Sequence, residues 1–168
     1  MNAAVRRDGI LRILRAAEAP VSAAVLADRF GVSRQIIVGD VALLRAAGED
    51  ISATPRGYVC ARDNAAALRR TVACSHSAEQ TGEELYIFVD NGCTVMDVTV
   101  EHPVYGQLVG ALDLHSRYDV GEFLRRSAGA APLSSLTDGL HLHTLLCPDE
   151  ASFERVKDRL RERGFLFE

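Results

Sequence analysis

Two histidines in the C-terminal half of this sequence, His141 and His143, stand two residues apart in the segment GLHLHTLLC, which we expect to form a β-strand. Because side chains alternate across a strand, both imidazoles are expected on the same face. Two imidazoles on one strand face form half of a transition-metal site. A pair of surface or hydrogen-bonded histidines is the alternative, so the pair needs partners from elsewhere in the chain.

A third imidazole and a carboxylate lie upstream of this pair. His76 ends an expected strand, and Glu84 follows eight residues later in an expected helix over residues 77–92. If that helix packs across the sheet, both side chains approach the histidine pair. Three histidines and one carboxylate suit zinc, nickel or iron(II) and can leave one coordination position open. A capping role three residues after Thr81 is the alternative for Glu84.

The two other histidines have less definite roles. His102 precedes Pro103 at an expected strand end or turn, where it either lines a ligand pocket or serves the turn itself. His115 is expected at another strand end, on the surface. All five histidines lie beyond residue 75, so we expect the metal chemistry in the C-terminal part.

The elements that carry these residues alternate between strand and helix. The pattern predicts strands over 69–76, 93–103, 104–114 and 139–147, helices over 77–92, 116–129 and 149–164, and a last edge strand over 165–168. The run 86–89 also suits a strand by propensity. The order β-α-β-β-α-β followed by a helix predicts an α+β fold with a ferredoxin-like sandwich over a domain of residues 63–168.

Residues 1–62 predict a separate domain. Apolar spacing indicates helices over 5–17, 22–30 and 34–48, and the last two are joined only by the turn Gly31-Val32-Ser33. That short turn is typical of a helix-turn-helix, and a small hairpin wing over residues 51–60 follows it. The apolar residues expected in its core are Val5, Ile10, Leu11, Ile13, Leu14, Val25, Leu26, Phe30, Ile36, Ile37, Val41, Leu43 and Leu44.

Four residues of this domain are predicted to contact DNA. Ser33, Arg34 and Gln35 begin the third helix, whose N-terminal residues reach base edges in helix-turn-helix proteins. Arg56 occupies the tip of the wing, where it can reach a phosphate or the minor groove. Gly39 lies within the same helix, where it permits close backbone approach to DNA or simply reduces contacts.

Charge and composition agree with this division of roles. Residues 1–64 hold nine arginines against seven acids, a net of +2, and residues 65–168 hold ten basic against sixteen acidic residues, a net of −6, which together give −4. A mildly basic front suits DNA binding. We expect a cytoplasmic protein with no membrane segment, because no apolar run approaches about 20 residues and the four scattered cysteines contain no CxxC pair.

Three blocks of the C-terminal part, CSHSAEQTGEEL, DVTVEHPVYGQL and PLSSLTDGLHLHTL, resemble the signature blocks of the three-histidine (3H) domain. That domain is found fused to a winged helix in niacin-responsive repressors of NAD biosynthesis, whose recognition helix is similar to GVSRQIIVGDVALLRAAG here. The resemblance covers about residues 5–168. In that family Gly39 is commonly a glutamine.

The resemblance implies a metal held by His76, Glu84, His141 and His143. It also implies nicotinic acid as a corepressor near that metal, and a homodimer that acts on operator DNA of niacin-uptake or NAD-synthesis genes. His102 occupies the middle histidine position of the pattern. The expected ligand-binding residues are His102, Tyr105, Ser134 and Ser135, with Thr137 close by.

Two other functions fit the same residues. A repressor that responds to the metal ion itself, or to another small molecule, predicts that nicotinic acid has no effect on DNA affinity. A metal-dependent hydrolase also fits an open site of three histidines and one carboxylate. We do not expect an enzyme, because the sequence shows neither a nucleophile motif such as G-x-S-x-G nor a phosphate loop.

Overall fold

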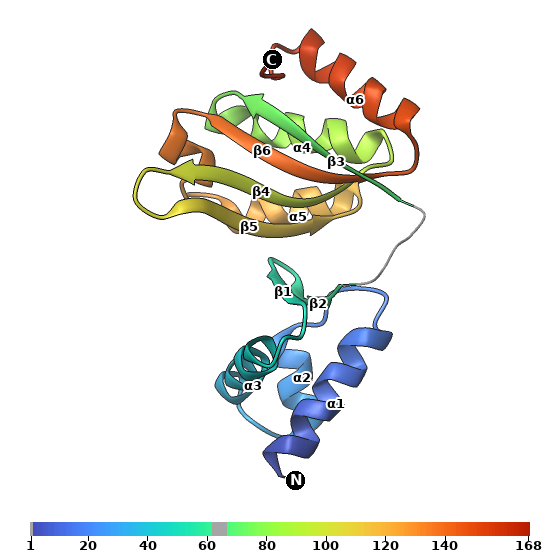
Figure 1. Ribbon diagram of the computed structural model, residues 1–168, viewed down its shortest axis with the longest axis vertical. Coiled ribbons are helices and arrows are strands. Elements are labelled where there is room, and N and C mark those ends of the chain that lie inside the picture. Colours follow the sequence, from blue (N-terminus) through green and yellow to red (C-terminus); the bar gives the residue numbers. More distant parts are fainter. Residues whose placement is uncertain (1, 62–66) are drawn as a thin grey trace. The chain divides into compact units, whose positions relative to one another are not determined.

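The computed structural model describes residues 2–61 and 67–168, and the chain divides into two compact units, Met1–Asn64 and Ala65–Glu168 (Figure 1). The domain boundary predicted after residue 62 lies outside the described residues. Each unit is described by itself below. None of the described helices is long and apolar enough to cross a membrane.

Side-chain caps set the helix starts of the N-terminal unit. Ser22 and Ser33 each accept a hydrogen bond from the backbone N–H three residues on, which satisfies a donor that the first helical turn leaves free. Gly31, at φ 63°, ends the second helix in the left-handed conformation. In chain order the elements of this unit are α1 (Ala3–Ala16), α2 (Ala23–Phe30), α3 (Arg34–Ala46), β1 (Ile51–Thr54) and β2 (Gly57–Cys60).

The core of this unit is formed by one apolar stripe from each helix. Ile10, Leu26, Ile37 and Val41 are almost completely buried there. Four of the predicted core residues are wrong, because each lies about 90° or more around its helix from the centre of the buried stripe. The exposed fractions are 59% for Val5, 56% for Val25, 43% for Ile36 and 56% for Leu43.

A buried carboxylate ties the first helix to the third. Asp40 of α3 is 4% exposed, and its Oδ2 atom lies 2.6 Å from Nε of Arg6 on α1. Arg7 approaches the other carboxylate oxygen at 3.5 Å. This pairing balances the buried charge and fixes α3 relative to α1.

The hairpin wing is anchored to the chain in front of α2. β1 and β2 pair in antiparallel register around residues 55 and 56, as predicted. Val21 and Tyr58 exchange two backbone hydrogen bonds of 3.0 and 2.9 Å. Gly57, at φ 137°, allows this approach, because a Cβ atom there would lie 2.5 Å from the Val21 carbonyl carbon.

The C-terminal unit confirms the predicted α+β class and element order. The run 86–89 is helical, and Ser77 forms a capping box with Gln80 in front of that helix. The elements are β3 (Leu68–Ser75), the 3₁₀ turn η1 (Ala78–Gln80), α4 (Thr81–Asp90), β4 (Thr94–His102), β5 (Gly106–Leu114), α5 (Arg117–Ser127), the 3₁₀ turn η2 (Leu133–Thr137), β6 (Leu140–Cys147) and α6 (Glu150–Glu162).

The four strands form one antiparallel sheet in the order β3-β6-β4-β5. β3 and β4 therefore run parallel on either side of β6, and β5 and β6 run parallel on either side of β4, the arrangement called split β-α-β. Helices α4 and α5 cover one face, and α6 packs beside α4 (Figure 1). The predicted last edge strand is reduced to one bridge, between Leu166 and Cys74 of β3.

The core of this unit lies between the sheet and the helices. Phe88, Leu145, Leu160 and Phe165 are among its largest buried apolar side chains, at 2% exposure or less. All four cysteines of the chain are free thiols. Cys93 and Cys147 face each other within this core, with their sulfur atoms 2.8 Å apart.

Candidate metal centre

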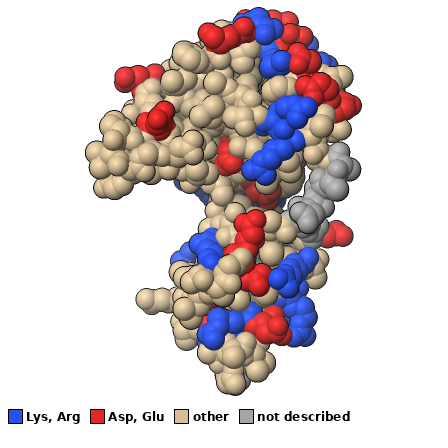
Figure 2. All heavy atoms as spheres, in the orientation of Figure 1, with Lys and Arg blue, Asp and Glu red and all other residues tan. Residues whose placement is uncertain are grey.

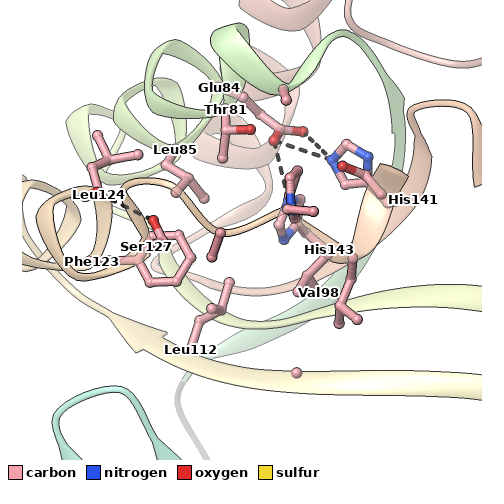
Figure 3. Close-up of a pocket in the computed structure, with 17 residues that line it drawn as sticks. Thr81, Glu84, Leu85, Val98, Leu112, Phe123, Leu124, Ser127, His141 and His143 are labelled. Carbon is pink, nitrogen blue, oxygen red and sulfur yellow. Dashed lines mark hydrogen bonds and ion pairs between the residues drawn. The ribbon is translucent and has the colours of Figure 1, made fainter. Parts of the chain in front are cut away.

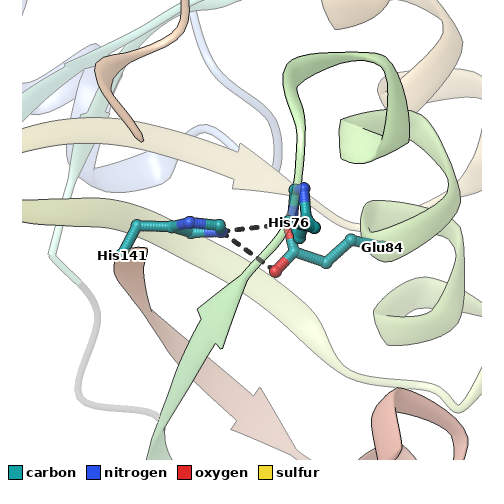
Figure 4. Close-up of side chains that lie close together, drawn as sticks. All are labelled: His76, Glu84 and His141. Atoms are coloured by element: carbon teal, nitrogen blue, oxygen red, sulfur yellow. Dashed lines mark hydrogen bonds and ion pairs between the residues drawn. The ribbon is translucent and has the colours of Figure 1, made fainter. Parts of the chain in front are cut away.

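Three imidazoles converge on one buried carboxylate in the C-terminal unit. The Nε2 atom of His76 lies 2.7 Å from Glu84 Oε2, that of His141 lies 3.0 Å from Oε1, and that of His143 lies 3.3 Å from Oε2. All four side chains are at least 97% buried, since their exposed fractions are 1, 0, 3 and 3%. The ligand atoms of His76, Glu84 and His141 lie within 4.8 Å of one another (Figure 4).

The other ring nitrogen of each histidine is fixed by a backbone carbonyl. The Nδ1 atoms of His76, His141 and His143 donate to the carbonyl oxygens of Ser77, Gly139 and Asp97 at 2.8, 2.7 and 2.7 Å. A carbonyl can only accept, so each Nδ1 carries a proton. The neutral imidazole therefore directs an Nε2 lone pair toward Glu84, which is the usual outer-shell arrangement of metal-binding histidines.

The three Nε2 atoms and the Glu84 carboxylate suit a bound cation better than they suit hydrogen bonds with one another. Neutral Nε2 atoms and carboxylate oxygens are all acceptors, so the cluster needs a shared positive charge between them. His76 Nε2 is buried and, despite its short distance to Glu84, makes no hydrogen bond with the described residues. A divalent transition metal would supply the missing charge, and the ligand atoms of His76, Glu84 and His141 lie close enough together to hold one, whereas His143 falls outside this group.

The pKa shifts of the cluster without a metal also indicate that it needs a balancing positive charge. Burial alone would lower the pKa of His76 and His143, but the Glu84 carboxylate outweighs it and raises both. Burial would likewise raise the pKa of Glu84, but the charge of His143 and hydrogen bonds from His141 and His143 hold it well below its ordinary value. Without a metal, the Glu84 carboxylate therefore favours the protonated forms of His76 and His143.

Neighbouring elements bring these residues together from distant parts of the chain. His141 and His143 on β6 stand opposite Cys74 and Val72 of β3, so that His76, just beyond β3, reaches the same face. Glu84 belongs to α4, and its carboxylate contacts His141 and His143 on that face. Gly139, at φ 95°, allows the chain before β6 to approach His76, because a Cβ there would lie 2.5 Å from the His76 carbonyl oxygen.

A cavity of about 360 Å³ opens beside the cluster. Glu84, His141 and His143 form its polar end, while α4, α5, β4, β5 and the segment before η2 supply mainly apolar walls (Figure 3). Among the residues that the structure describes, neither lysine nor arginine lines it. The labelled apolar residues are Leu85, Val98, Leu112, Phe123 and Leu124.

Of the four residues predicted to bind a ligand, Ser134 lines this cavity and is buried. Ser135 is exposed, and its hydroxyl donates to the carbonyl of Pro132. His102 and Tyr105 lie at the hairpin end between β4 and β5, where His102 Nδ1 accepts from the backbone N–H of Val104 and Tyr105. That end is an uncharged lobe in Figure 2, with Tyr105 75% exposed, and it does not line the cavity.

The predicted DNA-contacting residues lie at the start of α3 and on the wing. Ser33 caps α3, and Arg34 and Gln35 are exposed in its first turn. Arg56 lies between β1 and β2 and is half-buried.

Several residues of the site were missed by sequence reasoning. The carbonyls of Gly139 and Asp97 hold two imidazoles, and Leu112, Phe123 and Leu124 wall the cavity. Nothing distinguishes these residues in the sequence from ordinary turn and core residues. Asp40 of the other unit did carry a signal, because it is an acid between apolar residues on the buried stripe of its helix.

Comparison with known proteins assigns both units. An HTH domain matches residues 6–59, and a 3H domain matches residues 69–168. The probable transcription repressor NiaR of Thermotoga maritima is 46% identical over 165 residues, covering 97% of this chain and 94% of the relative. The transcription repressor NadR of Bacillus subtilis is 44% identical over 166 residues, covering 96% and 92%.

A winged helix-turn-helix joined to a histidine-rich α+β domain defines the class as DNA-binding transcription regulators. The chain belongs to the family of HTH–3H transcription repressors that includes NiaR and NadR. The resemblance inferred from the sequence blocks is confirmed, and so is the prediction of a regulator and not an enzyme.

Proposed function

We propose that this protein represses genes of NAD synthesis or niacin uptake, with nicotinic acid as its corepressor. In this proposal His76, Glu84, His141 and His143 bind a divalent transition metal, with nickel, zinc and iron as the candidates, and nicotinic acid binds beside it. The repressor acts as a homodimer on two operator half-sites, since dimers of helix-turn-helix proteins read half-sites about one DNA turn apart.

The cavity beside the cluster of three histidines and Glu84 is the observation that carries this proposal. Its volume of about 360 Å³ and its apolar walls suit a small planar ring. Within the described part of the chain, the charged or imidazole groups that line it are Glu84, His141 and His143, all at one end. A carboxylate group on the ring would therefore be placed at that end, because the remaining walls would leave its charge unpaired.

In this proposal the bound metal and the cavity residues have different roles in holding the ligand. When bound, the metal supplies a positive centre that a carboxylate can approach. Leu112, Phe123 and Leu124 exclude water from the ring and set its plane, and the Thr81 and Ser134 side chains line the same cavity. Binding that favours the DNA-competent conformation tenfold requires about 1.4 kcal/mol of differential affinity.

Two measurements on the full-length protein test this proposal. Nicotinic acid should bind the metal-loaded protein by calorimetry and should bind the chelator-treated protein at least about tenfold more weakly. Nicotinamide, which has the same ring without the charge, should bind the loaded protein weakly. Equal binding of both compounds, or binding that ignores the metal, would contradict the proposed site.

A charge placed in the cavity gives a matched pair of variants. Ser127 lines the cavity near the end of α5, and Ala128 is exposed and outside the lining. Ser127→Asp should weaken nicotinic acid binding by about tenfold through charge repulsion, whereas Ala128→Asp should leave it unchanged. Similar weakening in both variants would mean that the carboxylate does not lie in this cavity.

Operator affinity decides between the proposed effector and the metal itself. Fluorescence anisotropy of metal-loaded protein on operator DNA should show tighter binding when nicotinic acid is added. If the metal alone changes the affinity and nicotinic acid adds nothing, the protein responds to the ion and the corepressor assignment is wrong.

A further inference from the structure

The exposed surface of the recognition helix α3 is unusually apolar. Ile36 and Val38 are each 43% exposed, and Leu43 is 56% exposed. A solvent-facing helix surface is ordinarily polar, and β-branched residues such as Val38 are poor helix formers. Val38 therefore does little to stabilise the helix, and none of the three side chains is buried in the unit's core, which suggests that they contact another molecule.

The charge on the same surface indicates what that molecule is. Among the residues of α3 the single carboxylate is Asp40, which is buried and paired with Arg6 and Arg7. The exposed charged residues of α3 are Arg34 and Arg45, both basic. An apolar helix surface with basic residues and no exposed acid complements the major groove of DNA, whose phosphates flank the edges of the bases.

Helical spacing selects Val38 from the three exposed apolar residues. Residues three and four apart share a helix face, so Val38 and Gly39 each share a face with Gln35, whereas Ile36 directly follows Gln35 and Leu43 lies eight residues after it. Gly39 has open space around its Cα, with nothing within 4 Å of the position of a Cβ atom. The backbone can therefore come close to the base edges at Gly39, and Val38 is the exposed apolar residue that shares a face with Gln35 in the N-terminal half of α3.

We propose that Val38 contacts the 5-methyl group of a thymine in each operator half-site, and that this contact contributes to operator specificity. Thymine is the base that offers an apolar group in the major groove. Burying one methyl group contributes about 0.8 kcal/mol, which corresponds to about a fourfold change in affinity. Gln35, one turn earlier, would read the neighbouring base through its amide.

The test begins with a selection from random duplex DNA by the full-length protein, with and without divalent metal and nicotinic acid. The enriched duplex is then made with thymine or with 2′-deoxyuridine, which lacks only the methyl group, at each thymine in turn. Fluorescence anisotropy of the wild-type protein should show about fourfold weaker binding when one particular thymine per half-site is replaced.

Val38→Ala should bind the thymine duplex about fourfold more weakly and should not distinguish it from the uracil duplex. Because alanine favours helix more than valine does, this variant keeps α3 folded. Leu43→Ala is the matched control, since Leu43 is exposed on another side of α3 and its variant should retain the wild-type preference for thymine. An unchanged wild-type affinity for every uracil duplex would overturn the proposal. A persisting thymine preference in Val38→Ala, or a selection that enriches no thymine, would do the same.

Discussion

Gly139 should control the metal centre, because it touches two of its histidines at once. Its carbonyl oxygen accepts the hydrogen bond from His141 Nδ1, and its Cα lies against the backbone of His76. Replacing it by alanine has two effects. At φ 95° any other L-residue costs about 1–2 kcal/mol, and the new Cβ would lie 2.5 Å from the His76 carbonyl oxygen, which is backbone and must shift.

Gly129 provides a matched control in the same unit. It also has a positive φ, of 81°, but a Cβ atom there would meet nothing within 4 Å. Gly129→Ala should therefore cost only the backbone term of about 1–2 kcal/mol. Gly139→Ala should cost a further 1–3 kcal/mol or so, the usual range for forcing an extra methyl group into a packed site.

Thermal unfolding and metal titration measure the two effects separately. A cost of 1 kcal/mol lowers Tm by about 4–8 °C in a domain of this size, so the two variants should differ by at least about 4 °C. The affinity for Zn²⁺ or Ni²⁺, measured by competition with a chromophoric chelator, should fall about 10- to 100-fold in Gly139→Ala, as when an outer-shell partner is lost. Equal metal affinities in the two glycine variants would refute this account of how His76 and His141 are positioned.

Three further outcomes follow from the contacts described above. Asp40→Asn removes the charge that balances the α1 arginines, and it should lower the unfolding free energy of the N-terminal unit by about 2 kcal/mol, less than for a fully buried pair because these arginines reach solvent. Gly57→Ala should push the wing away from the chain before α2 and weaken operator binding in anisotropy titrations by about tenfold. The metal-free protein should be most stable between about pH 4.5 and 6.5, as followed by Tm. The lowered pKa of Glu84 makes its contribution present above its ordinary value near 4.5, and it is lost as the pH falls. The raised pKa of His76 makes its contribution complete below about 6.5, and it is lost as the pH rises.

Each of these outcomes has a control. Asp8→Asn removes an exposed acid from α1 and should have little effect on stability. Gly48 also has a positive φ, but a Cβ atom there would meet nothing within 4 Å, so Gly48→Ala should bind the operator more tightly than Gly57→Ala does. Equal weakening of operator binding in both variants would argue against the wing contact. Saturating metal should abolish the decline in Tm above pH 6.5. If Tm still declines above pH 6.5 in the metal-loaded protein, the decline comes from groups outside the histidine cluster.

Local chemistry made the elements predictable. Ser22, Ser33 and Ser77 mark helix starts, and Gly31 marks a helix end, because caps and left-handed turns depend on single residues. Exposure was less predictable, as Val25 and Leu43 show. Apolar residues beside a buried stripe look like core residues until the helix phase is fixed by packing.

The sequence indicated which residues belong to the candidate site, but it could not show how they come together in space. Alternation along one strand placed His141 and His143 together, but the approach of His76 and Glu84 depends on β6 pairing with β3 and on α4 crossing above it. Those are long-range contacts, which no local pattern encodes. The same long-range contacts decide which residues line the cavity, and they leave Tyr105, close in sequence to His102, outside its lining.

The interior position of β6 also has a consequence for synthesis on the ribosome. The N-terminal unit is complete before residue 65, whereas His141 and His143 must pair with Glu84 across 57 and 59 residues of chain. The middle of the sheet stays vacant until this late strand emerges and inserts between β3 and β4. Because domains fold in the order in which they leave the ribosome, the nascent repressor gains its DNA-reading fold before its histidine cluster can form.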